Sequence, residues 1–210
     1  MKLTRIARVN DMIYRGLSML ALLGLFACAT PYDPLEDYEQ VDAATNLDAP
    51  AAEPGSDAPE TRDQVKRGDY LVEVLGCGAC HTDGALGGDP DTDRPLAGST
   101  TGIAYTNPLE HRFPGVVYPS NITPDEETGI GGQSDLQIAG AVRSGVGRHA
   151  GRRITVMPWQ GYARLTEEDV TAIVSYLRSI KPIRHQVPEA VPPGTRAKYP
   201  YVHFGVYQSR

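Results

Sequence analysis

Apolar residues recur at helical spacing in three parts of the chain, and each recurrence predicts one helix. The first predicted helix begins near Asp63 and leads directly into Cys77. Its apolar stripe consists of Val65, Leu71, Val72 and Leu75. Gly68 lies within this helix, where glycine costs about 1 kcal/mol relative to alanine. A glycine in that position would let a second helix cross closely.

The second and third predicted helices each begin at a hydroxyl residue that can cap the first turn. Ser134 begins the second, with Gln137 at the capping-box position, and Gly145 ends it. Thr166 begins the third, and Pro182 ends it. The third has the clearest periodicity, with apolar residues at i, i+3, i+4 and i+7. These residues are Val170, Ile173, Val174 and Leu177.

The remaining stretches lack such a period. Residues 82–133 are dense in Gly, Pro, Asp and Thr, and the tail 183–210 combines prolines with aromatic residues and is expected to be extended. No strand pattern is evident, so we expect an all-α fold of three or more short helices with long irregular loops. A structureless run as long as 82–133 is unusual in a compact domain unless it wraps a large flat cofactor.

The composition leaves the core short of large side chains. The 210 residues include 22 Gly and 17 Pro, and only 7% are aromatic. Two explanations are open: much of the chain is disordered, or something other than side chains fills the core.

The N-terminus has the pattern of an export signal over residues 1–27. A basic segment precedes the apolar stretch 17–27, which is too short to span a membrane comfortably. The stretch ends in Leu25-Phe26-Ala27-Cys28, which resembles a bacterial lipobox, where the leader is cut before a cysteine that then carries lipid. An ordinary secretory signal cut nearby and an uncleaved anchor are the alternatives. All three place the mature domain outside the cytoplasm. The lipoprotein alternative places it in the periplasm, anchored to a membrane by its lipid.

Residues 28–62 carry most of the negative charge of the chain. Nine acidic residues stand there against Arg62 alone, and apolar side chains are few. Such a segment cannot bury enough surface to offset its ordering entropy, so we expect a disordered acidic tether. A folded domain over 63–182 and the tail 183–210 follow it. The charge pattern gives no indication of nucleic-acid binding.

Cys77-Gly78-Ala79-Cys80-His81 is the motif that carries the chemistry. A C-x-x-C-H sequence is typical of c-type haem attachment, in which two thiols bind one edge of the porphyrin and the histidine binds iron. A zinc site would need two further ligands at suitable spacing, and these are lacking. A redox dithiol is expected in a βαβ context, which the predicted helices do not provide. We therefore predict one covalent haem c, with His81 as an iron ligand.

The second axial ligand is found by elimination. Met157 is the only methionine outside the leader, and Pro158 biases it away from helical geometry, which suits a loop holding a thioether against the haem. His149 and a five-coordinate iron are the alternatives. Trp159 is expected either at the haem edge or in the core. A metal-bound histidine donates its other ring N–H to a carbonyl or carboxylate, and the carbonyl of Pro95 is our candidate.

With these residues assembled, the chain resembles the class I cytochrome c family over roughly 63–182. The haem domains in the cytochrome subunits of membrane-bound bacterial alcohol and sugar dehydrogenases are more similar still. That similarity rests on Asn121-Ile122-Thr123-Pro124-Asp125, Thr128-Gly129-Ile130-Gly131 and Met157-Pro158-Trp159. The resemblance implies a contact between Gly68 and Tyr176, and it places Asn121 close to the haem.

The sequence thus predicts a monohaem electron carrier rather than an enzyme, because two filled axial positions leave no vacancy for substrate. It would work in the periplasm between a dehydrogenase or quinol oxidiser and a terminal acceptor. One alternative is a fixed subunit of a membrane-associated oxidoreductase complex, with aromatic residues 199–207 as its docking strand. A haem enzyme or gas sensor with an open site is the other.

Overall fold

The computed structural model describes residues 49–52, 59–145 and 156–205 of the chain. The predicted export signal, the lipidation candidate Cys28 and the alternative ligand His149 lie outside these residues. Within them, no helix combines the length and apolar character that crossing a bilayer requires.

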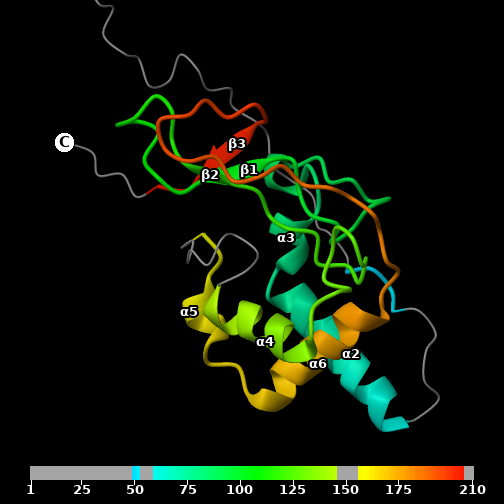
Figure 1. Ribbon diagram of the computed structural model, residues 1–210. Helices are drawn as coiled ribbons and strands as arrows, with labels where there is room; N and C mark the ends of the chain where they lie inside the picture. The colour runs from blue at the N-terminus through cyan, green and yellow to red at the C-terminus, as the bar shows by residue number, and fades with distance from the viewer. Residues whose placement is uncertain (1–48, 53–58, 146–155, 206–210) are drawn as a thin grey trace, which may run out of the picture. The chain divides into compact units, whose positions relative to one another are not determined.

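The described residues form short helices on one side and a small sheet on the other (Figure 1). The helices are α2 (Pro59–Val74), α3 (Cys77–His81), α4 (Asp135–Ser144), α5 (Trp159–Tyr162) and α6 (Glu167–Ser179), with a 3₁₀ turn at Ala85–Gly87. The strands are β1 (Gly102–Ala104), β2 (Val116–Val117) and β3 (Tyr201–His203). The three long helices lie where the apolar periodicity predicts them.

Helices α2 and α6 form the centre of the helical layer. A Cβ atom built on Gly68 would lie 2.0 Å from the carbonyl oxygen of Ala172 and 2.6 Å from Cβ of Tyr176. The backbones therefore approach too closely for any side chain at position 68, and the implied contact between Gly68 and Tyr176 is confirmed. The buried apolar residues around this crossing include Leu71, Val72, Ile173, Val174 and Leu177.

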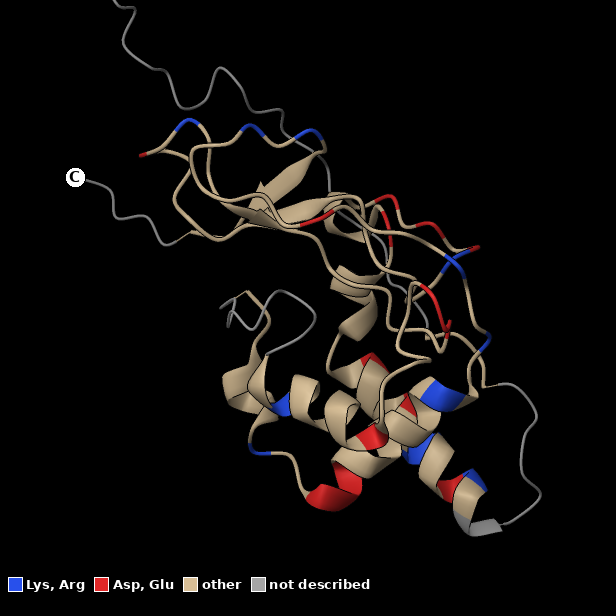
Figure 2. Cartoon of the chain, viewed as in Figure 1, with Lys and Arg blue, Asp and Glu red and all other residues tan. Residues whose placement is uncertain are grey.

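The helix caps follow the local sequence. Ser134 and Gln137 form the reciprocal capping box, with the hydroxyl accepting from the Gln137 N–H and the amide oxygen accepting from the Ser134 N–H. At α6 the Thr166 hydroxyl accepts from the Asp169 N–H. The first turn of α6 also carries Glu167, Glu168 and Asp169, and Figure 2 shows this acidic helix end. Acidic groups there interact favourably with the positive end of the helix dipole.

The all-α expectation needs a correction, because the irregular region contains a three-stranded sheet in the order β2-β1-β3. Strands β1 and β2 are antiparallel, with Ile103 opposite Val117, and β1 and β3 are parallel, with Ile103 opposite Val202. Strands of two and three residues are too short to produce a visible alternation. β3 belongs to the tail 183–210, so this tail is part of the folded body as far as residue 205.

The predicted tether over 28–62 also needs correction within its described part. Ala49 and Ala52 pack against the core cluster, and the Tyr176 hydroxyl donates a hydrogen bond to the Pro50 carbonyl. Helix α2 begins at Pro59, before the predicted boundary. Small residues with little apolar surface can dock in this way when a buried hydroxyl supplies a hydrogen bond.

Candidate haem site

The pentapeptide from Cys77 to His81 forms its own short helix, α3. Gly76 has φ of 69°, a left-handed conformation that glycine adopts without steric cost, and it separates α3 from α2. Residues three and four apart share one side of a helix, so Cys77, Cys80 and His81 lie on the same side. The local sequence thus brings the two sulfur atoms and the imidazole together without help from distant segments.

Both cysteines are free thiols and both are partly buried. Burial, together with the neighbouring Cys80, raises the pKa of Cys77 to about 11. Burial also raises the pKa of Cys80. Both thiols are therefore neutral at pH 7 in the protein alone. Among the described residues, no group of three or more His, Cys, Asp or Glu side chains could hold a metal ion.

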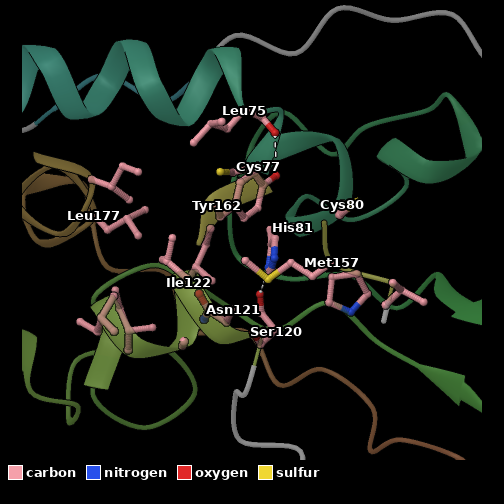
Figure 3. A pocket seen from close by; sticks show the side chains of 18 of the residues that line it. Leu75, Cys77, Cys80, His81, Ser120, Asn121, Ile122, Met157, Tyr162 and Leu177 are labelled. Atoms are coloured by element: carbon pink, nitrogen blue, oxygen red, sulfur yellow. Dashed lines mark hydrogen bonds between the residues drawn. The ribbon is translucent and has the colours of Figure 1, made fainter. Parts of the chain in front are cut away.

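His81 is oriented by the main chain. Its Nδ1 lies 2.7 Å from the carbonyl oxygen of Ser120, and the dashed line in Figure 3 marks this hydrogen bond. A carbonyl can only accept, so Nδ1 carries the proton and Nε2 presents its lone pair. An imidazole in this tautomer is prepared for binding a metal through Nε2.

The prediction that Pro95 supplies this carbonyl is wrong. The segment around Pro95 supports the backbone next to His81 instead of the ring. Leu96 N–H donates to the Thr82 hydroxyl at 3.1 Å, and Gly98 N–H donates to the His81 carbonyl at 2.8 Å. Leu96 has φ of 59°, so the chain turns sharply there, and this turn engages neighbouring backbone groups.

The thiols and the imidazole face a large cavity. It contains about 1370 Å³ of space not filled by atoms, a volume that includes the solvent in its open mouth. The described residues that line it include no Asp, Glu, Lys or Arg. The apolar part of the wall includes Leu75, Ile103, Val117, Ile130, Ile138 and Leu177.

Met157 lines the same cavity, on the segment that leads into α5. Figure 3 shows its thioether and the His81 ring together in the cavity, although the two residues come from distant parts of the sequence. Pro158 follows as the residue that caps α5, and its backbone is not helical (φ −77°, ψ 49°). The predicted pair of sulfur and nitrogen donors is therefore brought to one place.

The two other predicted site residues differ in position. Asn121 lines the cavity and is 2% exposed. Trp159 is not among the described lining residues, and a Cβ atom on Gly145 would lie 2.8 Å from its ring. The indole thus packs on the end of α4, which favours its core-packing alternative. Tyr162 lines the cavity beside the cysteines, and burial raises its pKa to about 12.

Together these donors fit a covalently attached haem. Two neutral thiols stand beside an imidazole with a fixed tautomer, and a thioether and a wall whose described residues are uncharged complete the cavity. Sequence reasoning missed Ser120 because a main-chain carbonyl leaves no trace in the residue type. Proximity to Asn121 is the one signal that could have pointed to it.

Comparison with known proteins finds cytochrome subunits of bacterial dehydrogenases among the relatives of this chain. The chain is 34% identical over 160 residues to the fructose dehydrogenase cytochrome subunit of Gluconobacter japonicus. The aligned residues make up 76% of this chain and 29% of that protein. It is 36% identical over 120 residues to the gluconate 2-dehydrogenase cytochrome c subunit of Pantoea cypripedii, covering 57% and 24%.

The alcohol dehydrogenase (quinone) cytochrome c subunit of Gluconobacter oxydans is 33% identical over 124 residues, covering 58% of this chain and 23% of that protein. The chain thus spans about a quarter of the length of these curated relatives. Residues 65–181 match the cytochrome c family, and this range contains the thiols, the imidazole, the thioether, all of α6 and the part of α2 that carries Gly68. The chain belongs to the cytochrome c family.

Proposed function

We propose that this chain is a monohaem c-type cytochrome that transfers electrons in the periplasm for a dehydrogenase. The observation that carries the proposal is the cavity that Cys77, Cys80, His81 and Met157 share. The sequence contains a single C-x-x-C-H motif, which supports one haem per chain. The dehydrogenase partner is proposed from the names of the relatives.

Each residue of the site has a distinct task in this proposal. Cys77 and Cys80 would hold the porphyrin through their sulfur atoms, and His81 and Met157 would bind its iron. A haem bound there would supply reversible one-electron exchange at its iron. Methionine as an axial ligand and an uncharged, partly buried wall both favour the less charged ferrous state and raise the reduction potential. With both axial positions filled, electron transfer is favoured over the open-site enzyme or gas sensor.

The proposed location rests on sequence alone. The export signal over 1–27 supports the periplasm, and Cys28 after its apolar stretch supports a lipid anchor. A lipid on Cys28 would keep the cytochrome close to a membrane without fixing its orientation. A mass measurement on the mature protein tests this part, because lipidated Cys28 gives a mass that an ordinary signal cleavage does not.

Haem attachment is the decisive test. The full chain is produced in a host competent for cytochrome c maturation, and the pyridine haemochrome is measured per mole of protein. We expect one haem that survives denaturation. The double variant Cys77→Ser with Cys80→Ser should carry no covalent haem. A colourless wild-type protein that is exported and folded would overturn the proposal.

Ligation by Met157 has its own measurement. Met157→Ala should abolish the weak near-infrared band of Fe(III)–Met while haem remains attached. Leu136→Ala is the matched control, because this apolar side chain is 85% exposed on α4. Persistence of the band in Met157→Ala would show that another residue binds the iron.

A fixed subunit is the second candidate function. The side chains of Tyr199 and Phe204, on either side of β3, are 47% and 70% exposed, and such apolar exposure favours docking to a partner. Removing 183–210 would disrupt β3 and the folded body, so point changes are the better test. If Tyr199→Ser with Phe204→Ser co-purifies with the same partners as wild type, this candidate fails.

A further inference from the structure

A buried polar network surrounds the loop that follows Ser120. Asn121 is 2% exposed and Thr123 is 0% exposed. The resemblance to known haem domains places Asn121 near the haem, but it assigns no task to the side chain. Polar groups buried this deeply cost free energy unless their hydrogen bonds are satisfied, so the partners of these two side chains indicate what they do.

The Asn121 amide uses both of its ends. Its Nδ2 donates to the carbonyl of Ile183 at 2.7 Å and to the Thr128 hydroxyl oxygen at 3.0 Å. Its Oδ1 accepts from the N–H of Thr123 at 2.9 Å and from the Thr123 hydroxyl at 2.7 Å. An amide has two donors and one acceptor oxygen, so this side chain is fully engaged within the protein and its orientation is fixed.

The network continues into the segment after α6. The N–H of Ile183 donates to the Thr123 hydroxyl oxygen at 3.1 Å, and the N–H of His185 donates to the Thr128 hydroxyl oxygen at 3.0 Å. Residues 183–185 are thereby bound to the 121–128 loop through both backbone and side-chain groups. The chain direction after α6 is set by this loop as much as by Pro182.

The same loop holds the peptide group that orients His81. The Ser120 carbonyl and the Asn121 N–H belong to one planar peptide unit, so fixing Asn121 fixes the direction of the carbonyl that lies 2.7 Å from His81 Nδ1. Ile122 N–H donates to the Leu96 carbonyl at 3.0 Å. Close packing limits this peptide further, because a Cβ atom on Gly98 would lie 2.7 Å from the Asn121 nitrogen.

We propose that Asn121 and Thr123 are positioning residues. They bind segment 183–185 to the Ser120–Asn121 peptide and hold the hydrogen bond to His81 Nδ1. Through this hydrogen bond they set the reduction potential of the iron. This inference rests on the proposed function, since it requires that His81 is an axial ligand. A strong hydrogen bond at Nδ1 makes the imidazole a better electron donor. A better donor stabilises Fe(III), so the network lowers the potential.

Thr123 offers an isosteric pair for the test. Thr123→Val removes the hydroxyl without changing the shape of the side chain, and Thr123→Ser keeps the hydroxyl. Thr171→Val is the matched control, because its hydroxyl bonds the Glu167 carbonyl at 2.7 Å on the exposed side of α6, outside this network. The holoproteins are titrated spectroelectrochemically, and exchange of the His81 Nδ1 proton is followed by ¹⁵N NMR.

We expect Thr123→Val to raise the reduction potential and to speed exchange of the ring proton. Thr123→Ser and Thr171→Val should keep the wild-type values. If Thr123→Val does not fold, Thr128→Val is the second test of the inference. It removes the oxygen that accepts from Asn121 Nδ2 and from the His185 N–H, and we expect the reduction potential to rise there too. Wild-type potential and exchange in the folded valine variant would overturn the inference. Absence of haem from the wild type would instead overturn the proposed function.

Discussion

The hydroxyl of Tyr162 donates a hydrogen bond of 3.0 Å to the carbonyl oxygen of Leu75 (Figure 3). Leu75 stands shortly before Cys77, and Tyr162 stands in α5, shortly after Met157. The bond therefore joins the segment that carries the thioether to the end of α2 that leads into the thiols. This polar contact links two sides of the cavity.

Removing this bond should loosen Met157. Tyr162→Phe leaves the Leu75 carbonyl without the hydroxyl partner, and we expect a loss of about 1 kcal/mol in the free energy of unfolding. We also expect the near-infrared band of Fe(III)–Met to disappear at a lower urea concentration than in wild type. Urea titrations followed at this band and at the Soret band measure both effects.

Tyr70→Phe is the matched control for this prediction. The Tyr70 side chain is 54% exposed on α2, and its ring lies 5.7 Å from the Arg67 guanidinium, a contact that phenylalanine preserves. We expect its urea midpoint at the near-infrared band to equal that of wild type. Equal midpoints for Tyr162→Phe and Tyr70→Phe would show that the bond to Leu75 does not hold the methionine.

Replacing either of two glycines by alanine should change the free energy of unfolding, in opposite directions. Gly68 lies at the crossing of α2 and α6, and Gly140 lies in α4. Gly68→Ala would place a Cβ atom 2.0 Å from the Ala172 carbonyl oxygen. The helices must then separate, and we expect a loss of about 1–3 kcal/mol despite the better helix propensity of alanine. A Cβ atom added at Gly140 in α4 would meet no other described part of the chain within 4 Å, so Gly140→Ala should stabilise by about 0.5–1 kcal/mol.

Thermal unfolding of the two holoproteins checks this pair. The expected result is a lower midpoint for Gly68→Ala and a higher midpoint for Gly140→Ala than for wild type. A rise at both positions would mean that the crossing of α2 and α6 tolerates a methyl group, contrary to the close approach of their backbones.

The parts of this protein that the sequence predicts are those whose cause is local. The apolar stripe of α6 and the cap at Ser134 depend on residues within two turns, and the Cys77 to His81 motif fits within one short helix. Met157 is found by elimination rather than by pattern. These features contain the cysteines, the histidine and the methionine that line the candidate site, so these residues could be named from the sequence alone.

The parts that could not be predicted depend on partners distant in sequence or on backbone atoms. The Ser120 carbonyl that orients His81 lies 39 residues away along the chain. Strand β3 pairs with β1 across about half of the chain through three residues each. Residues 49–52 dock through a main-chain carbonyl. None of these contacts produces a periodic pattern or requires a particular residue type.

Asp83, two residues after His81, gives a prediction about pH. Its carboxylate accepts from the Thr100 N–H at 2.8 Å, from the Thr100 hydroxyl at 2.9 Å and from the Ser99 hydroxyl at 3.3 Å. Burial alone would raise the pKa of Asp83, but these hydrogen bonds outweigh it and hold the pKa below its ordinary value of 3.8. The carboxylate therefore stabilises the fold above that value, and its contribution is lost as the pH falls through the lowered pKa.

Asp83→Asn should cost about 1 kcal/mol at pH 7, because the charge-assisted bonds become neutral ones. The difference from wild type should shrink as the pH is lowered below the ordinary pKa of aspartate, about 3.9. Urea unfolding at pH 7 and pH 3 measures it. Asp93→Asn, which changes an exposed carboxylate, is the control and should show little difference at either pH. If the free energy of unfolding differs between wild type and Asp83→Asn by the same amount at pH 7 and pH 3, ionisation of Asp83 does not stabilise the fold.

The hydrogen bond from Tyr176 to the Pro50 carbonyl predicts that one hydroxyl holds residues 49–52 on the body. The Tyr176 side chain is 0% exposed, and burial raises the pKa of its hydroxyl well above the ordinary value, so it remains a donor throughout the physiological range. Ala49 and Ala52 bury little apolar surface, and the bond therefore supplies much of the attachment.

Tyr176→Phe keeps the ring beside Gly68 and removes the hydroxyl, including its interaction with the Asp69 carboxylate. We expect about 1 kcal/mol less stability for the docked segment, equivalent to about fivefold faster amide hydrogen exchange at Ala51 and Ala52. The exchange rates of the α6 amides should change less, because the ring packing persists. Tyr199→Phe removes a hydroxyl from an exposed ring and should leave both regions at wild-type rates. Unchanged exchange at Ala51 and Ala52 in Tyr176→Phe would mean that the segment is held by its apolar contacts and not by the hydroxyl.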